Sequence, residues 1–441
     1  MSTKHQRRTR SGLIVTVVTA AMVLTGCATT SPAPKATATA AGKLSVWFPG
    51  TNQAEIDLVT KKIVPAFEKK TGADVTVTYV DWNNISPKLN AAFAAGTAPD
   101  VFGHGPAAAA DFVANGRLEP LTADIASLTK KDQGDIASAL SGGKVDGKQY
   151  LVPLSMTGNL IMYNADDFTA AGLNPDKPPT TWEGIKAAAE KLTQRKDGTI
   201  TRSGLLLPSQ PTGRSQSFAA LLFAGGGSLV NKAGTKATFD SPAGVKALDF
   251  MTSLYSGSDA VSANLGADYA NAPIAQQPLV LGTASMTMLP ATTMQQILAA
   301  YPSKNLRVLQ PAALGSGKPA TFGGAGPGLM INADSKQKSL AWEFIKYMIS
   351  PAVSAEYTQG IGAIPIRTSA LSTDYVKSSP VLKAFLKASP DFVANPNVGG
   401  WVQVRDQLDK QVELALNKVT PAKDALEAAA NAANPILKAN G

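Results

Sequence analysis

The segment from residue 43 to residue 80 constrains the fold most, because its hydrophobic period changes twice. Residues 43–49 (KLSVWFP) alternate apolar and polar side chains, which is typical of a β-strand. Residues 56–67 then place apolar side chains at helical spacing, and residues 74–80 (DVTVTYV) return to alternation. A strand, a helix and a second strand form a βαβ unit, whose strands are parallel. We therefore expect an α/β protein.

Later segments extend this pattern. Residues 160–163 (LIMY) predict a buried strand, and Thr180–Glu183 carries the S/T-x-x-E capping box ahead of a helix over residues 182–192. The last sixty residues are predicted to be helical, with Val404, Leu408, Val412 and Leu416 at a spacing of four. Because 441 residues exceed what one hydrophobic core normally serves, two compact units are expected.

The N-terminus has the form of an export signal. Four basic residues precede an apolar stretch, residues 12–24, that is too short to span a bilayer. The only cysteine, Cys27, follows directly in Leu24-Thr25-Gly26-Cys27, which resembles the lipobox of bacterial lipoproteins. The resemblance implies a signal peptide over residues 1–26 and lipidation of Cys27. The alternative is a spare buried cysteine, and export by the Sec or the twin-arginine route stays open.

Residues 27–42, rich in Ala, Thr, Ser and Pro, predict a flexible tether. We therefore expect an extracytoplasmic protein, lipid-anchored to the outer face of the bacterial plasma membrane. The net charge of +9 falls when the four basic residues of the leader are removed, and no Lys/Arg block follows the tether. This weakly basic balance gives no sign of a nucleic-acid partner.

Four groups of motifs together resemble the family 1 extracellular solute-binding proteins of ABC importers, the class that includes maltose-binding protein. They are VPAFEKKTG at 64–72, AGTAPDV at 95–101, the series GKQY, VPL, MYN and PTTWE within 147–183, and FGG with AWEFIKY within 322–347. The resemblance implies a two-lobe periplasmic-binding-protein type II fold, with mostly parallel sheets flanked by helices and several hinge crossings.

The resemblance also implies where the chain changes lobe. We expect an N-lobe of residues 43–154 plus 329–360, a C-lobe of residues 160–321 plus 366–441, and hinge segments at 154–159, 322–328 and 360–366. Glycines such as Gly323 and Gly324 suit a hinge, which must absorb large backbone changes, although each one alone could simply form a turn.

Candidate ligand-binding residues follow strands, because ligands of open parallel sheets sit beyond the carboxyl ends of the strands. In the first lobe these are Trp47, Phe48, Asn52, Asp81, Trp82 and His104. The family resemblance adds Thr157, Gln216, Phe322, Gly323 and Trp401. Trp47 could equally belong to the core, and His104 could be a structural histidine.

One departure from the family bears on the ligand. Residues 285–292 (SMTMLPAT) lack the tryptophan that sugar-binding members often carry after this strand. The missing ring weakens an oligosaccharide assignment and leaves room for a monosaccharide, a polyol or a glycerol phosphodiester.

The expected function is capture of a small polar solute, foremost a sugar, between the lobes and its delivery to an ABC permease. We expect a monomer that is not an enzyme and needs no cofactor or metal. A secreted lipoprotein hydrolase acting on glycans is an alternative. However, HExxH and G-x-S-x-G motifs are lacking, and His104 is the only histidine beyond the leader. A binding lipoprotein that reports to a sensor kinase is the third possibility.

Overall fold

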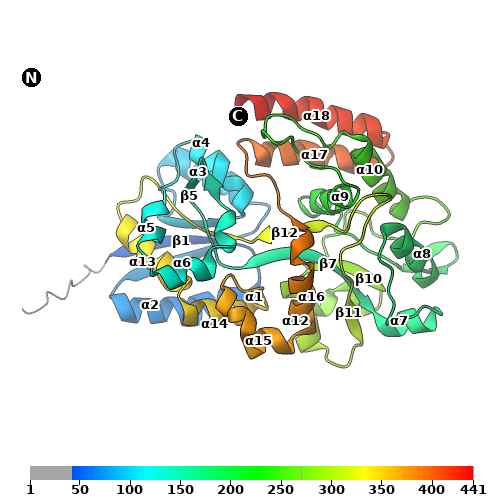
Figure 1. Ribbon diagram of the computed structural model, residues 1–441, viewed down its shortest axis with the longest axis horizontal. Coiled ribbons are helices and arrows are strands. Elements are labelled where there is room, and N and C mark those ends of the chain that lie inside the picture. The colour runs from blue at the N-terminus through cyan, green and yellow to red at the C-terminus, as the bar shows by residue number, and fades with distance from the viewer. Residues whose placement is uncertain (1–41, 270, 441) are drawn as a thin grey trace, which may run out of the picture. The chain divides into compact units, whose positions relative to one another are not determined.

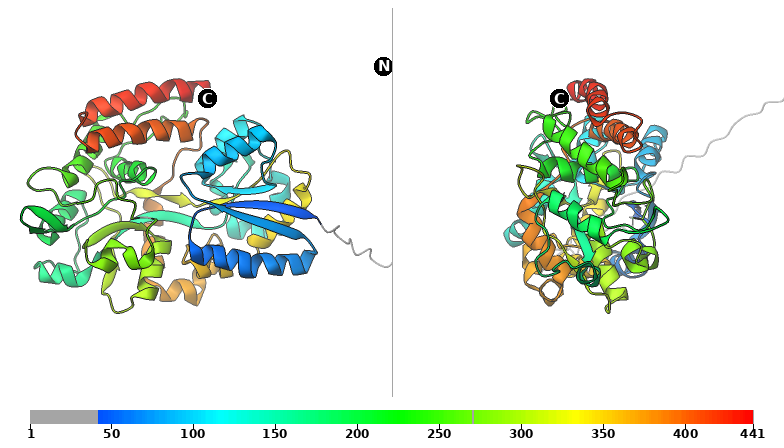
Figure 2. Two further views of the ribbon diagram at one scale, coloured as in Figure 1. Left: turned by 180° about the vertical axis from the view of Figure 1, so that it is seen from behind. Right: turned by 90° about the vertical axis from the view of Figure 1, so that its right-hand side faces the viewer.

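The computed structural model describes residues 42–269 and 271–440. The predictions for the signal peptide, for Cys27 and for the tether up to residue 41 lie outside these residues. Two mixed sheets, each flanked by helices, define two lobes (Figures 1 and 2). None of the described helices is both long enough and apolar enough to cross a lipid bilayer.

The first lobe is built on a five-stranded sheet. Its order is β2 (Asp74–Val80), β1 (Lys43–Pro49), β3 (Val101–His104), β13 (Gly328–Ile331) and β6 (Val152–Pro153). Strand β1 runs parallel to β2 and β3, which confirms the βαβ unit expected at the start of the mature chain. Strand β13 is antiparallel to both of its neighbours.

Helices cover both faces of this first sheet. They are α1 (Gln53–Leu58), α2 (Val64–Thr71), α3 (Ile85–Ala95), α4 (Ala109–Ala114), α5 (Thr122–Ala126), α6 (Lys130–Ile136), α13 (Lys338–Met348) and α14 (Pro351–Ile361). A π-helical turn, Val59–Ile63, joins α1 to α2 just ahead of Pro65. A short hairpin pairs β4 (Lys144–Val145) with β5 (Lys148–Gln149).

Alternation along β1 divides the core of the first lobe. Leu44, Val46 and Phe48 join the cluster that contains Phe344 of α13, whereas Trp47 packs against the cluster on the opposite face. Because successive side chains of a strand point to opposite faces, the sequence period alone assigns these residues to two cores.

The second lobe is built around β7 (Met156–Asn164). This strand pairs antiparallel with β10 (Met286–Pro290), β11 (Leu306–Val308) and β12 (Thr321–Ala325), and β12 pairs parallel with β14 (Phe392–Val393). The α/β class is confirmed, but the sheets are mixed instead of mostly parallel. Strands β7 and β13 each enter by a direct crossing from the other lobe, so no crossover helix sets their direction.

Helices also sandwich the second sheet. One face carries α8 (Trp182–Leu192), α9 (Gly213–Ala224), α10 (Pro242–Tyr255), α17 (Trp401–Leu416) and α18 (Ala422–Ala439). The other face carries α11 (Pro278–Leu281), α12 (Ala291–Ala300), α15 (Asp374–Ser378) and α16 (Pro380–Ala388). Helix α7 (Ala165–Ala170) and the hairpin of β8 (Gln194–Lys196) and β9 (Thr199–Arg202) complete the lobe.

Helix starts test the capping predictions directly. Helix α8 begins where predicted, but Thr181, not Thr180, is its cap: the Thr181 hydroxyl accepts from the Gly184 N–H at 3.1 Å. The predicted helical C-terminus is present as α17 and α18, which lie side by side (Figure 1). Residues 389–400 depart from the prediction: they form a short 3-10 turn, strand β14 and a loop, because Pro390, Pro396 and the pair Gly399-Gly400 interrupt the helix.

The chain passes between the two sheets more than once. It crosses between β6 and β7, returns between β12 and β13, and leaves the first lobe again after α14. There the Met156 N–H donates to the Ile364 carbonyl at 2.9 Å, which ties the first crossing to the third. The exact lobe boundaries and hinge segments stay a prediction.

Candidate ligand-binding cleft

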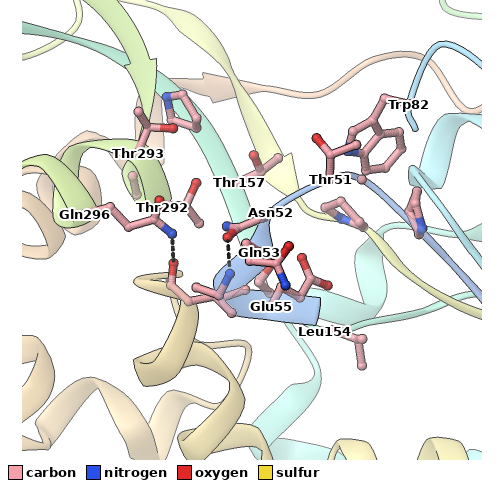
Figure 3. A pocket seen from close by; sticks show the side chains of 18 of the residues that line it. Thr51, Asn52, Gln53, Glu55, Trp82, Leu154, Thr157, Thr292, Thr293 and Gln296 are labelled. Atoms are coloured by element: carbon pink, nitrogen blue, oxygen red, sulfur yellow. Dashed lines mark hydrogen bonds between the residues drawn. The ribbon is translucent and has the colours of Figure 1, made fainter. Parts of the chain in front are cut away.

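A cavity of about 710 Å³ lies between the two sheets, with walls from both lobes (Figure 3). The first lobe contributes the loop after β1, the Trp82 side chain and the end of α14. The second lobe contributes residues 271–274 and 277 and the first turns of α12, and the crossing segments at residues 154–157 and 327–329 complete the lining. The cavity therefore sits where a solute would contact both lobes together.

The loop after β1 is shaped by one glycine and one cap. Gly50 has a φ of +114°, which favours glycine, and its N–H donates to the Val80 carbonyl at 2.7 Å. This bond ties the loop after β1 to the end of β2. Asn52 then caps α1 by accepting from the Ala54 N–H at 3.0 Å. The result places the polar side chains of Thr51, Asn52 and Gln53 at the cavity.

Trp82 follows β2 and stands at the cavity with 38% of its surface exposed. Its ring meets the His104 ring edge-on, with 6.1 Å between centroids. A Cβ at Gly50 would lie 3.3 Å from the indole Nε1, so the glycine also lets the indole approach the loop backbone. An exposed indole supported from behind is well suited to pack against a ligand ring.

The opposite wall is the start of α12. Strand β10 ends at Pro290, and the helix that follows brings Thr292, Thr293 and Gln296 to the cavity (Figure 3). The Gln296 Nε2 atom donates to the Ile361 carbonyl at 3.5 Å, which joins the second lobe to the end of α14. This wall offers hydroxyl and amide groups and no aromatic ring.

The charge of the cavity comes from one side chain. Glu55 of α1 is the only acidic residue that lines it, and the described lining contains no Lys, Arg or His. Burial raises the pKa of Glu55 to about 7, and the hydrogen bond from the Tyr357 hydroxyl opposes this rise. Burial likewise raises the pKa of Tyr357 well above its ordinary value, with a further rise from the neighbouring Glu55.

The structure brings four predicted site residues to this cavity: Phe48, Asn52, Trp82 and Thr157. The other seven lie outside its lining: Trp47, Asp81, His104, Gln216, Phe322, Gly323 and Trp401. The cavity lining gives no support for ligand contact by these seven residues, and for them it stays a prediction.

His104 is held behind Trp82. Its Nδ1 accepts from the Gly105 N–H at 2.9 Å, so Nε2 carries the proton and donates to the Ser86 Oγ at 2.9 Å. Burial and, to a smaller extent, the nearby Arg405 together lower the pKa of His104 to about 4. A neutral ring with both nitrogens bonded to the protein has no hydrogen-bonding capacity left for a ligand, so His104 supports the Trp82 ring.

Trp401 is 1% exposed at the start of α17, within the core of the second lobe. Its neighbours Gly400 and Val402 donate their N–H groups to the Asp111 carboxylate of α4, which joins the two lobes at this point. The helical spacing of Val404, Leu408 and Val412 continues back to Trp401 and turns its ring inward.

The remaining predicted residues have local structural partners. Gln216 accepts from the Asn159 side-chain amide at 3.1 Å, and Asp81 accepts from the Asn83 N–H at 2.8 Å. Gly323 faces the ring of Phe392, and Trp47 packs in the core of the first lobe. Phe322 is nearly buried in β12.

Two groups of lining residues were not predicted. Thr292, Thr293 and Gln296 directly follow the strand whose missing tryptophan was noticed, so the departure marked the right segment. Glu55 occupies a polar helical position that resembles any solvated helix face, and only the packing of α14 against α1 reveals it.

Comparison with known proteins decides the family. Residues 62–384 match the family described as bacterial extracellular solute-binding protein. The chain belongs to this family. The family resemblance found in the sequence is thereby confirmed, and so is the coarse expectation of an extracellular location.

Individual relatives align with this chain over most of their own length and most of its length. A binding protein of Brucella abortus is 26% identical over 381 residues, which cover 86% of this chain and 89% of the relative. The diacetylchitobiose-binding protein DasA of Streptomyces coelicolor is 25% identical over 369 residues, which cover 82% of each chain. An ABC transporter solute-binding protein of Thermotoga lettingae, crystallised with alpha-D-tagatose, is 26% identical with a TM-score of 0.79, covering 90% of this chain and 100% of that one.

Proposed function

We propose that this protein captures a sugar in the cavity between its lobes and delivers it to the permease of an ABC importer. One observation carries the proposal: both lobes contribute hydroxyl and amide side chains to a shared cavity that has an exposed indole on one wall. A sugar presents a ring of hydroxyl groups and an apolar face, so aimed polar groups and one aromatic wall match its chemistry.

The relatives support this proposal. One relative is a diacetylchitobiose-binding protein and another was crystallised with tagatose, and both align along most of this chain. A glycerol phosphodiester fits the cavity less well, because its phosphate would be desolvated without a Lys, Arg or His in the described lining. A polyol shares the hydroxyl chemistry and is the second candidate ligand.

Transport would use closure of the two lobes. A solute that contacts both walls favours the state in which they converge, and that state would dock on the permease. We further propose that Cys27 carries a lipid anchor, which would hold the receptor at the outer face of the membrane beside its permease.

Trp82→Ala tests the binding site. We expect the substitution to weaken sugar binding about tenfold or more, equivalent to about 1.4 kcal/mol or more, measured by titration calorimetry against a panel of sugars and polyols. Val419→Ala is a matched control, because Val419 is 69% exposed and does not line the cavity.

Unchanged sugar affinity in Trp82→Ala would contradict the proposal that the sugar packs against Trp82 in this cavity. Sugar binding without any turnover supports a receptor, whereas release of cleaved product would favour the glycan hydrolase. Uptake that persists in a strain lacking the protein would favour the sensory alternative.

A further inference from the structure

Glu55 differs from the other residues that line the cavity because its side chain carries an ionisable carboxyl group. Its Oε1 accepts from the Tyr357 hydroxyl at 2.7 Å, and the Tyr79 hydroxyl lies 3.5 Å from the Glu55 carbonyl oxygen. Tyr357 is 5% exposed, so α14 holds the carboxyl in place from its buried side. In the described part of the chain Oε2 has no hydrogen bond, although the residue lines the cavity. One carboxylate oxygen is therefore fixed and the other is available to a ligand.

The nearby cations bond to other carboxylates. Lys61 lies 2.9 Å from Asp57, and Lys62 pairs with Glu356 of α14. The titratable groups that face Glu55 are Tyr79 and Tyr357, and neither carries a positive charge. The described residues thus leave the Glu55 carboxylate without a counter-charge.

We infer that Glu55 selects the ligand by charge, so that the cavity prefers a sugar carrying an ammonium group to its neutral counterpart and rejects an anionic sugar. The inference deepens the proposed function and rests on it. An ammonium group would donate a charge-assisted hydrogen bond to Oε2 and supply the missing positive charge. A carboxylate or phosphate on the sugar would instead bring a like charge next to the Glu55 carboxylate, with no Lys, Arg or His in the described lining to offset it.

The titration of Glu55 agrees with this arrangement. Burial without a cation raises its pKa to about 7, so the carboxylate ionises within the neutral range. A cationic sugar stabilises the ionised form. The affinity advantage of the ammonium sugar should therefore be largest near pH 7, where both charges are present. It should shrink as the pH falls and Glu55 is protonated, and also as the pH rises and the sugar amine, which titrates like an α-amino group at about 7.7–8.0, loses its proton.

The test is calorimetric titration of the purified full-length protein at pH 7, where the sugar amine is still protonated, with matched sugars. Glucose, glucosamine and glucuronate form one set, and galactose and mannose with their amino and acid forms give two more. We expect the best amino sugar to bind at least tenfold tighter than its neutral counterpart, and the corresponding acid to bind at least tenfold weaker.

Glu55→Gln keeps an oxygen for the Tyr357 bond and removes the charge. We expect it to reduce both preferences to within about threefold. Asp57→Asn is the control, because it removes the same charge from the same helix at a residue outside the cavity, and it should leave both preferences intact. Should Glu55→Gln fold poorly, the ratio of amino-sugar to neutral-sugar affinity in the wild type between pH 7 and pH 5 gives the same information, because the sugar amine stays protonated over this range.

The outcomes separate the two proposals. Three results would overturn the charge selection and leave sugar binding in place. They are equal affinity for neutral, amino and acid sugars, a preference that survives in Glu55→Gln, and a ratio of amino-sugar to neutral-sugar affinity that does not fall as the pH is lowered. If no sugar in any set binds, the proposed function fails and the charge selection fails with it.

Discussion

Asp135→Asn should destabilise the protein by breaking the bonds that hold residues 367–369 on the first lobe, ahead of the last passage of the chain into the second lobe. Asp135 of α6 accepts from Arg367 Nη1 at 2.9 Å, from the Thr368 hydroxyl at 2.8 Å, and from both the N–H and the hydroxyl of Ser369 at 2.6 Å. These bonds attach the segment that leaves α14 to the first lobe.

The magnitude follows from burial. Arg367 is 4% exposed, and it also donates to the Ile349 carbonyl through Nε at 2.8 Å and Nη2 at 2.6 Å. Breaking a buried ion pair from one side costs about 3–5 kcal/mol. Arg367 keeps a second partner, Asp132, at 2.9 Å, so we expect the lower end, about 3 kcal/mol.

The pH dependence has a defined sign. Burial alone would raise the pKa of Asp135, but the hydrogen bonds from Ser369, Arg367 and Thr368 outweigh it and hold the pKa well below its ordinary value. The ionised carboxylate therefore stabilises the folded state above the unfolded pKa, about 3.9, and this contribution is lost as the pH falls through the folded pKa. The difference between wild type and Asp135→Asn should shrink below about pH 4.

Urea unfolding at pH 7 and pH 3, extrapolated linearly to water, measures both effects. Asp132→Asn is the control, because the Asp132 side chain is 28% exposed and it should cost no more than about 1 kcal/mol. A loss below about 1 kcal/mol for Asp135→Asn at pH 7, or a loss equally large at pH 3, would refute this reasoning.

Two further substitutions probe the second lobe and its contact with the first. Gly323→Ala places a Cβ 2.6 Å from Phe392 Cγ, so we expect about 1–3 kcal/mol of destabilisation in thermal unfolding, and a wild-type melting temperature would contradict that packing. Asp111→Ala removes the acceptor for the Gly400 and Val402 N–H groups, and we expect this to weaken the contact between the lobes by about 2 kcal/mol. X-ray scattering should then show a larger ligand-free radius of gyration and calorimetry a several-fold weaker sugar affinity; unchanged values for both would exclude this contact as a stabiliser of closure.

The fold was predictable where one local period dominates. The alternation of residues 43–49 and 74–80 predicted β1 and β2, and the spacing of Val404, Leu408 and Val412 predicted α17. The direction of β13 was not predictable, because a strand that arrives from the other lobe carries no local signal of its orientation.

The site was predictable where residues end or follow a strand, or where the family resemblance marked a crossing between the lobes. Asn52 and Trp82 follow strands, Thr157 came from the resemblance, and all three line the cavity. His104 also follows a strand, but Ser86 and Gly105 use both ring nitrogens, and these partners are visible only in three dimensions. Glu55 depends on Tyr357, about three hundred residues further along the chain, and no spacing rule connects the two.

The hydrogen bonds that Asn52 and Gln296 already make within the protein determine which hydrogen-bonding groups of a solute they favour. The carboxamide oxygen of Asn52 is occupied by the Ala54 N–H, which leaves its amide hydrogens to point at a guest. Gln296 is the reverse: one of its amide hydrogens bonds the Ile361 carbonyl, and its side-chain oxygen has no partner among the described residues. A solute spanning the two walls is therefore bound best when it offers a lone pair to Asn52 and a hydroxyl hydrogen to Gln296, and this difference would let the receptor distinguish the two ends of an asymmetric molecule.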